Sequence, residues 1–585
     1  MAAAAQRRLD LPDEIWASIF TLIPDHHLEP LTLVCSQFLI LTNHLKPILR
    51  LPPSYPTPPT LPALLRRFTG LRAIDASGFS GDLDHLVYLI SRSGLRIEEL
   101  DFSGQRHLPV RGLSRFGPGL RELKVLKCSK LGVLRGDDLV AVAEAIPWIE
   151  DLDISYPDND CDFMEEIGVI RVGRSYLSDD AVREMSANLR DLTKINLSGN
   201  PFVSDRAIVA VATNCAKLRE IVAVDCCFVS KIGIADAIGR SPNLASVSVS
   251  GMELAYSDSA SIRASIRRAR SLSALHFSYS SISDEFLRSV ADARLPLKQL
   301  TVSNCFGFSL AGISTLISAY RGLTFLSCER VEGLTDEAMA GLAEFPPRLT
   351  YVNLNWCSNL GNLTLFAIIK CCSSIRQISM ERTSLGKERV PSDTVFSVNP
   401  SMKSLKVARN SLDDECVTGI ALACPSLEIF DLSQCWGITA TGITGVLNIC
   451  KEIRHLGLNQ LSISGLEKWD KGKVEFLEMK GLVGLTDDEL DMIGEGCPNL
   501  LSVDFSSCLN LSTAGVKRLV TKCSKLREMG LDWCEDMSFG NLASMVFQRR
   551  SLRKVVFGSN RSSNLLLSGE QKDVLFRHGC LVVQN

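Results

Sequence analysis

The chain has almost no net charge, no long apolar run and no apolar stretch among its first residues. Its 63 Lys and Arg residues against 66 Asp and Glu give a formal charge of −3, which excludes a general electrostatic attraction to nucleic acid or to an anionic membrane. No run of about eighteen apolar residues occurs, so no membrane-spanning helix is predicted. The N-terminal sequence MAAAAQRRLDLPDE lacks the apolar stretch of a signal peptide, which favours the cytoplasm or the nucleus.

Signatures of catalysis and of metal binding are also missing. The 8 histidines are scattered without an HExxH pattern or a Ser or Cys partner, and no GxxxxGKS/T loop occurs. None of the 20 cysteines has the CxxC-like spacing of zinc ligands. The chain is therefore predicted to be a binding protein and not an enzyme, with no catalytic residue and no metal.

A short apolar repeat fills most of the chain. Hydrophobic residues make up 46% of the 585 residues and charged residues 22%, which excludes wholesale disorder. A segment of the form LxxLxLxxC/N recurs, as in LTKINLSGN (192–200), LTYVNLNWC (349–357) and LREMGLDWC (526–534). Nineteen copies begin between Leu71 and Leu552, most often 26 residues apart. Such a period indicates an array of structural repeats.

Each copy predicts a strand followed by a helix. The copy alternates apolar and polar residues, as a short strand does, and the next residues, such as SDRAIVAVATNC (204–215), are apolar at helical spacing. A Ser or Thr before an acidic residue predicts the helix N-cap at Ser178, Ser204, Ser283, Thr335 and Thr486. The predicted fold class is α/β, a leucine-rich-repeat solenoid of about 18–19 repeats whose strands line a concave face.

Most cysteines follow the same period. Seven of them, such as Cys128 counted from Leu120, lie eight residues after the start of a copy, and six lie three residues before the next copy. This is the place of the Asn or Cys that closes the turn inside a solenoid, so we predict buried, reduced thiols. The pattern resembles the cysteine-containing class of leucine-rich repeats.

Residues 9–50 do not follow the repeat. They predict two or three short helices, with Pro12 at the first helical position and with apolar faces too large for so short a segment to bury. LPDEIWASIF (11–20) followed by LTLVCSQF (31–38) resembles the F-box. The resemblance implies a small all-α domain that binds a Skp-type adaptor and, through it, a cullin. A mere N-terminal cap on the solenoid is the alternative. The implied adaptor contacts are Leu11, Pro12, Ile15, Ile19, Leu31, Val34 and Cys35.

These features divide the chain into five parts. They are an N-terminal tail (1–8), the F-box (9–50), a proline-rich linker (51–62), the repeats (63–558) and a C-terminal cap (559–585). The linker carries six prolines from Pro52 to Pro62, which predicts either a stiff spacer or a packed first turn of the solenoid.

One repeat carries about 17 extra residues, roughly 156–173. They include PDNDCDFMEE, which is similar to a calcium loop at Asp158, Asp160 and Asp162 but lacks the glycine and the glutamate that such a loop needs. The segment is either a binding loop over the rim or a tolerated surface insertion.

Four arginines cluster in SIRASIRRAR (261–270). They fit a solvated helix face. The alternative is an inositol-polyphosphate site, as in the plant hormone-sensing F-box receptors, which the chain resembles in layout and length. No other cofactor is predicted.

The strand positions predict a substrate surface. Residues two, four, six and seven places after the first leucine face the concave side or its rim, and aromatic and Arg side chains there are typical of binding hot spots. The F-box resemblance implies the substrate-recognition subunit of an SCF (Skp–cullin–F-box) ubiquitin ligase, which presents a protein for ubiquitination and proteasomal degradation. A small-molecule-gated receptor and a ubiquitin-independent scaffold are the alternatives. The predicted substrate contacts are Tyr351, Asn355, Trp356, Arg382, Arg409, Asp431, His455, Lys480, Asp532 and Trp533.

Overall fold

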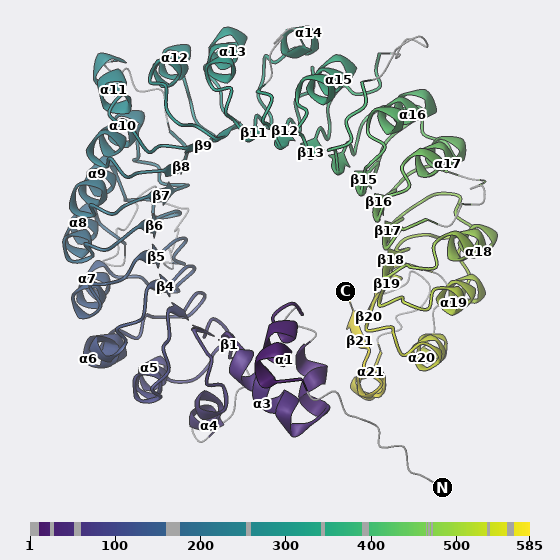
Figure 1. Cartoon of the computed structure of the whole chain (residues 1–585), viewed down its shortest axis with the longest axis horizontal. Helices are drawn as coiled ribbons and strands as arrows, with labels where there is room; N and C mark the ends of the chain where they lie inside the picture. The colour runs from purple at the N-terminus through teal and green to yellow at the C-terminus, as the bar shows by residue number, and fades with distance from the viewer. Residues whose placement is uncertain are drawn as a thin grey trace, which may run out of the picture. The chain divides into compact units, whose positions relative to one another are not determined.

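The chain folds into two compact units, Met1–Ser281 and Ile282–Asn585. The structure is a computed structural model, and it describes residues 11–23, 28–51, 60–158, 176–252, 259–340, 346–388, 397–463, 465, 469, 472–534, 539–558 and 567–584. In each unit, short parallel strands form a ladder whose one face is lined by helices (Figure 1). No helix within these ranges is long and apolar enough to cross a membrane.

The first unit starts with a helical head and continues as a ladder. The head consists of α1 (Asp13–Phe20), the 3₁₀ helix η1 (Glu29–Leu33) and α3 (Ser36–Leu45). The strands are β1 (Ile48–Arg50), β2 (Ala73–Asp75), β3 (Glu99–Asp101), β4 (Val125–Lys127), β5 (Asp151–Asp153), β6 (Lys194–Asn196), β7 (Glu220–Ala223), β8 (Ser246–Ser250) and β9 (Ala274–Ser278). The helices between them are α4 (Thr60–Arg67), α5 (Leu83–Arg92), α6 (Val110–Phe116) with η2 (Gly117–Gly119), α7 (Gly136–Ala145), α8 (Asp179–Asn188), α9 (Asp205–Asn214), α10 (Lys231–Arg240) and α11 (Ser259–Ile266).

The second unit repeats the same arrangement. Its strands are β10 (Gln299–Ser303), β11 (Phe325–Ser327), β12 (Tyr351–Asn353), β13 (Gln377–Ser379), β14 (Ser404–Lys406), β15 (Ile429–Asp431), β16 (His455–Gly457), β17 (Phe476–Glu478), β18 (Ser502–Asp504), β19 (Glu528–Gly530), β20 (Lys554–Phe557) and β21 (Leu581–Gln584). Its helices are α12 (Asp284–Asp292), α13 (Leu310–Ala319), α14 (Asp336–Ala340), α15 (Asn362–Cys371), α16 (Asp414–Ala423), α17 (Ala440–Ile449), α18 (Asp487–Gly496), α19 (Thr513–Lys522), α20 (Phe539–Gln548) and α21 (Gly569–Arg577).

The predicted α/β repeat solenoid is confirmed. Each of the nineteen predicted copies forms one strand, β2 to β20, and the ladders gain β1 and β21 at their outer ends. The cap predicted at 559–585 therefore contributes a further helix and strand, with Lys554 paired to Leu581. Beside the predicted insertion, Asp151 of β5 pairs directly with Lys194 of β6, so the ladder keeps its register. The calcium-loop and binding-loop interpretations concern residues 156–173, of which 159–173 lie outside the described residues.

One copy was predicted in the wrong register. β3 pairs with β4 through Glu99 and Val125, so this copy starts at Leu123 and not at Leu120. Leu120 and Leu123 are both buried, which is why the apolar pattern alone could not separate the two frames. Cys128 consequently fills the core position that Leu354 fills in a later repeat.

The cysteines at the strand exits tie neighbouring repeats together. The thiol of Cys357 donates to the carbonyl of Cys328 at 3.0 Å, and that of Cys435 donates to Val407 at 3.2 Å, in each case one repeat earlier. Asn410 holds the same position, and its amide donates to the carbonyl of Met380 at 2.7 Å. Cys and Asn alternate here because each offers a compact donor to a carbonyl that would otherwise be buried without a partner. The predicted burial of the periodic cysteines is confirmed, and every cysteine in the described ranges has a free thiol.

A carboxylate clamp joins consecutive helices. Four of the predicted N-caps are confirmed, at Ser178, Ser204, Ser283 and Thr486. In addition, the first Asp of one helix accepts two hydrogen bonds from the N-cap of the next helix. Asp414, for example, accepts from the backbone N–H of Thr439 at 2.8 Å and from its hydroxyl.

The clamp has a steric condition. Its carboxylate fills the space of a missing side chain, because a Cβ on Gly442 would lie 2.1 Å from Asp414 Oδ1. The triplet of Asp, Ser or Thr, and Gly recurs at Asp205–Ser230–Gly233, Asp284–Ser309–Gly312 and Asp487–Ser512–Gly515.

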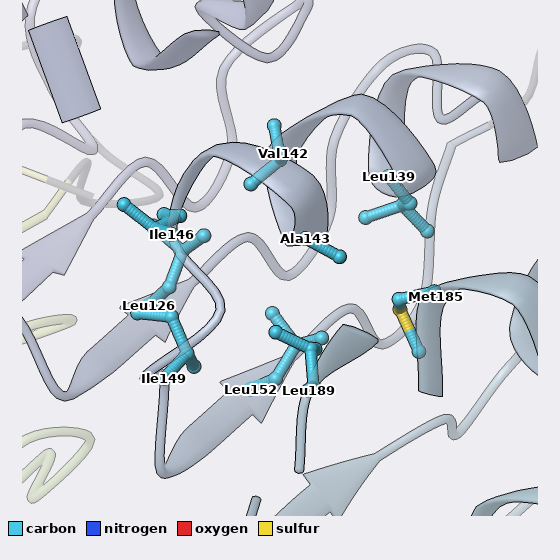
Figure 2. A pocket seen from close by; sticks show the side chains of 9 residues that line it. All are labelled: Leu126, Leu139, Val142, Ala143, Ile146, Ile149, Leu152, Met185 and Leu189. Atoms are coloured by element: carbon cyan, nitrogen blue, oxygen red, sulfur yellow. The ribbon is translucent and has the colours of Figure 1, made fainter. Parts of the chain in front are cut away.

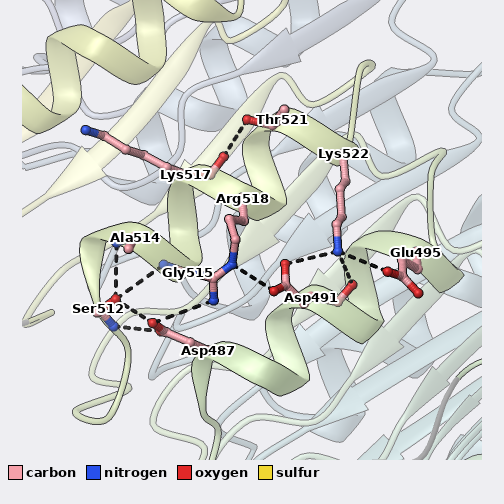
Figure 3. Close-up of polar contacts among 10 residues, drawn as sticks. All are labelled: Asp487, Asp491, Glu495, Ser512, Ala514, Gly515, Lys517, Arg518, Thr521 and Lys522. Atoms are coloured by element: carbon pink, nitrogen blue, oxygen red, sulfur yellow. Dashed lines mark hydrogen bonds and ion pairs between the residues drawn. The ribbon is translucent and has the colours of Figure 1, made fainter.

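Exposed ion pairs extend the clamp between α18 and α19 (Figure 3). Arg518 Nε lies 2.7 Å from Asp491, and Lys522 Nζ lies 3.0 Å from Asp491 and 3.2 Å from Glu495. The pairs with Lys522 and Arg518 lower the pKa of Asp491. Such exposed pairs each contribute about 0–1 kcal/mol, so the buried strand residues and the clamps dominate the stability of the stack.

Candidate functional site

An aromatic core holds the head together. The rings of Trp16 on α1 and Phe38 on α3 meet edge to face with centroids 4.7 Å apart, and Phe20 meets Phe38 at 4.9 Å. Gln37 also donates to the Asp13 carboxylate across the two helices at 2.6 Å. Because these rings fill the small core, many aliphatic side chains of the head remain on the outside.

The predicted adaptor residues are mostly on that outside surface. Val34 is 62% exposed, and Ile15 and Ile19 are also exposed. Pro12 and Cys35 are exposed as well, whereas Leu11 and Leu31 are half-buried. Pro12 occupies the N-cap of α1 and not its first helical position. The thiol of Cys35 accepts a hydrogen bond from Phe38 N at 3.4 Å, so this cysteine also caps α3.

Three more aliphatic residues of the head are exposed and were not predicted as contacts. Leu22 is 84% exposed, Leu33 is 88% exposed, and Ile40 is also exposed. Leu22 follows Ile15 and Ile19 at helical spacing, a signal that the sequence does carry. So many exposed aliphatics on a head of this size mark an interaction surface.

The head is joined to the ladder without a spacer. α3 leads directly into β1, which pairs with β2. Arg67 donates to the Asn43 side chain at 3.1 Å, His44 lies 3.0 Å from the Thr69 hydroxyl, and Lys46 lies over the ring of Phe68.

Residues 51–62 were predicted as either a stiff spacer or a packed first turn of the solenoid, and β1 already belongs to the ladder before this segment begins. This segment follows β1 and ends within α4, inside the first repeat. Most of it, residues 52–59, lies outside the described residues.

Two predicted substrate contacts serve the ladder itself. Asn355 Oδ1 accepts hydrogen bonds from Ser379 Oγ and Glu381 N, both at 2.8 Å, and so bridges two repeats. Asp431 Oδ1 accepts from Ser433 N at 3.0 Å, an arrangement that Asp504 repeats with Ser506 N at 2.9 Å. These polar atoms fix the strand exits, which sequence position alone did not reveal.

Each strand exit turns through a left-handed residue. The φ angles are 52° at Arg330, 63° at Trp356, 52° at Arg382 and 62° at Arg409. Trp356 is 42% exposed and lies between two guanidinium groups, with Arg330 Cζ 5.6 Å and Arg382 Cζ 4.1 Å from its ring centroid. The prediction identified Trp356, Arg382 and Arg409 but missed Arg330, although it lies one 26-residue period before Trp356.

The neighbouring predicted residues are partly engaged. Tyr351 stacks on Phe325 with centroids 4.5 Å apart, and burial raises the pKa of its hydroxyl. His455 Nε2 lies 2.9 Å from Glu478, and this hydrogen bond is the main reason that the pKa of Glu478 is lowered. Lys480 is exposed.

The two predicted tryptophans do not share one site. Trp533 is exposed and lies in the turn after β19, whereas Trp356 lies in the turn after β12. About seven strand spacings of roughly 4.8 Å therefore separate them. Asp532, beside Trp533, has one buried carboxylate oxygen without a hydrogen-bond partner. The most exposed tryptophan, Trp436 at 76%, was not predicted. It directly follows Cys435, a position that the strand rule did not include.

An internal cavity in the first unit is too small for a ligand (Figure 2). It measures about 10 Å³ and is lined only by apolar side chains, among them Leu126, Ile149 and Met185, whereas one water molecule already needs about that volume and polar partners. No group of three or more His, Cys, Asp or Glu within the described ranges is arranged to hold a metal ion. Of the clustered arginines, Arg263 lies in α11 on the helix side of the ladder, and Arg267, Arg268 and Arg270 follow that helix and are exposed.

The sequence is similar to parts of several known F-box proteins. No family model matches the sequence. The chain is 23% identical over 239 residues to "F-box/LRR-repeat protein 4" of Bos taurus, covering 39% of this chain and 34% of that protein. It is 29% identical over 148 residues to "F-box protein FBW2" of Arabidopsis thaliana, covering 24% and 45%. It is also 27% identical over 183 residues to "F-box protein SKIP1" of Arabidopsis thaliana, covering 31% and 56%.

These matches span about a third to just over half of each relative's length. Among solved structures, a chain of "Crystal structure of Rad7 and Elc1 complex in yeast" is similar at 14% identity with a TM-score of 0.39, over 77% of this chain and 89% of that one. That likeness is too distant to carry an argument. The short helical head and the 26-residue strand-and-helix ladder agree with the similarity of this chain to these F-box and leucine-rich-repeat proteins.

Proposed function

We propose that the chain is the substrate-recognition subunit of a Skp–cullin–F-box ubiquitin ligase. Its head binds a Skp-type adaptor, the adaptor links it to a cullin, and the open strand face of the ladder binds a protein substrate. The chain contributes binding and positioning, and its partners supply the ubiquitin transfer.

One observation carries this proposal: the set of exposed aliphatic side chains on the head. Ile15, Ile19 and Val34 are exposed, although their own helices have an aromatic core to pack on. Leaving such side chains in water costs about 1.5–3 kcal/mol each relative to burial, so a partner that covers them gains considerable free energy. Adaptor binding by an F-box uses a surface of this kind.

The direct junction between head and ladder supports the second half of the proposal. A receptor must hold its substrate at a defined distance from the adaptor, and here α3, β1 and β2 connect the two surfaces without an intervening flexible segment. The contacts of Asn43 with Arg67 and of His44 with Thr69 further fix the head on the first repeat.

The test replaces two exposed head residues with charges. Ile15→Asp with Val34→Asp should abolish recovery of the adaptor and the cullin, because each carboxylate would be buried in an apolar interface. Val483→Asp with Leu509→Asp is the matched control, since both residues are equally apolar and exposed but lie on the ladder. Normal recovery with the head variant would overturn the proposal, as would equal loss with the control.

A further inference from the structure

In the described part of the second unit, no acidic residue occupies the left-handed position of a strand-exit turn. The left-handed position in successive repeats holds Asn304, Arg330, Trp356, Arg382, Arg409, Gln434, Gln460, Gly481, Ser507 and Trp533. A residue other than glycine in this conformation costs roughly 1–2 kcal/mol, and Gly481 shows that glycine meets the needs of the fold. The large side chains at Arg330, Trp356, Arg382 and Arg409 are therefore not required for the turn itself.

The ring of Trp356 holds the two flanking guanidinium groups in place. Cation–π contacts of this length contribute about 0.5–1 kcal/mol at exposed sites, and here one ring serves both Arg330 and Arg382. Fixing the planar groups in advance lowers the entropy lost when a ligand binds. Within the described part of the chain, neither these two arginines nor Arg409 has an ion-pair partner.

The nearest carboxylates are held on the strand side. Glu329 Oε2 accepts a hydrogen bond from Asn353 Nδ2 at 3.2 Å. Glu381 is partly buried, and burial, with the nearby Asp431 and Glu329, raises its pKa, while Lys406 and Arg409 lower it. The charges that the turns of Arg330, Arg382 and Arg409 present to a partner are thus cationic. The neighbouring strand face carries both acidic and basic side chains.

We propose that Arg330, Trp356, Arg382 and Arg409 form a docking site for an acidic, extended segment of a substrate protein. This inference rests on the proposed receptor function and names the class of substrate. Arg382 and Arg409 follow the adjacent strands β13 and β14. Both can therefore bind the same carboxylate, since guanidinium groups donate hydrogen bonds in a geometry that suits a carboxylate. Arg330 ends the strand two places before that of Arg382, about 9.6 Å away. In an extended chain, residues three apart are about 10 Å apart, so a second carboxylate at that spacing reaches Arg330.

The test uses a synthetic peptide and the full chain purified with its adaptor. The probe is a fluorescein-labelled ten-residue Gly/Ser peptide with two glutamates three residues apart, and its binding is followed by anisotropy. Arg382→Gln with Arg409→Gln should weaken binding at least about tenfold, the range of hot-spot truncations. The matched control is Arg348→Gln with Arg376→Gln, because these exposed arginines precede β12 and β13 and lie at the opposite strand ends.

Two further arms separate the site from general charge attraction. A peptide with the two glutamates adjacent should bind less tightly than the spaced peptide, and Trp356→Leu should weaken binding of the spaced peptide while leaving every charge in place. Equal losses in the rim and control variants, or binding of a peptide with glutamine at both positions as tight as that of the probe, would overturn the inference. A complex that retains its adaptor but does not bind the probe refutes the acidic site alone, whereas a chain that recovers no adaptor refutes the receptor function.

Discussion

Adding one methyl group at Gly442 should destabilise the ladder, although the same change normally stabilises a helix. Gly442 lies in the first turn of α17, and its missing side chain leaves the space that the Asp414 carboxylate occupies. An alanine Cβ there would lie 2.1 Å from Asp414 Oδ1 and 2.8 Å from its Cγ. The carboxylate must move, because atoms at such distances overlap.

The magnitude follows from the bonds that the displaced carboxylate loses. Asp414 accepts from both the backbone N–H and the hydroxyl of Thr439, and hydrogen bonds to charged groups contribute about 1.5–3 kcal/mol each. The helix propensity of alanine returns about 1 kcal/mol. Losing both bonds and gaining that propensity, Gly442→Ala should reduce the local stability by about 2–5 kcal/mol.

The control lies in the same helix. A Cβ on Gly445 would meet nothing closer than Thr418 Oγ at 3.6 Å, so Gly445→Ala should stabilise the helix by up to about 1 kcal/mol. Hydrogen–deuterium exchange of the amides in α16 and α17 measures both effects as local opening free energies. Equal protection in the two variants would refute the clamp. Adding Asp414→Ala to Gly442→Ala should remove the clash, so the two changes should cost less together than the sum of their separate effects.

Three other outcomes are expected. Burial raises the pKa of the Cys215 thiol to about 12, so iodoacetamide at pH 8 should alkylate it at least about a hundredfold more slowly than the exposed Cys227 in the folded chain, and equal rates would contradict the buried-thiol structure. Burial raises the pKa of Glu381 above 4.5, so the folded state binds its proton more tightly and loses stability as the pH rises from about 4.5. Glu381→Gln should flatten that part of the pH–stability curve in urea titrations. If the slope does not change, the loss of stability comes from other groups. Trp356→Ala and Trp533→Ala should together weaken capture of the protein that co-purifies under proteasome block by at least about tenfold, with additive effects because the sites are far apart, and strong coupling between them would contradict the separation along the ladder.

The repeat could be predicted because its period is a direct consequence of the packing. Each copy buries the same positions, as Leu349, Val352 and Leu354 do, and the N-caps at Ser204 and Thr486 follow from their hydroxyls and the acidic residues behind them. Pairing within each unit then needs no further information, since each strand pairs with its sequence neighbour. The local preferences of the sequence and the packing between repeats favour the same structure, and such a fold can be predicted from sequence.

The boundary between head and ladder could not be read in this way. β1 has only three residues, Ile48, Leu49 and Arg50, and only Leu49 is buried. A single buried side chain gives no repeating pattern that the sequence could reveal. The prolines after it suggested a spacer, but proline is also compatible with a turn inside a repeat. The pairing of Leu49 with Ile74 shows that β1 is already part of the ladder, which three residues of sequence could not indicate.

The substrate surface shows a similar limit, and its cause is specific. The strand rule selects side chains by direction, yet direction does not tell whether a polar atom is already bonded, as in Asn355 and Asp431. What the period does predict is proximity: residues one repeat apart at the same turn position lie beside each other, as Arg330, Trp356 and Arg382 do. The fold demands a left-handed backbone at that position and leaves the side chain open. Folding therefore does not account for the choice of arginine and tryptophan in these turns, whereas the acidic ligand proposed above would account for it.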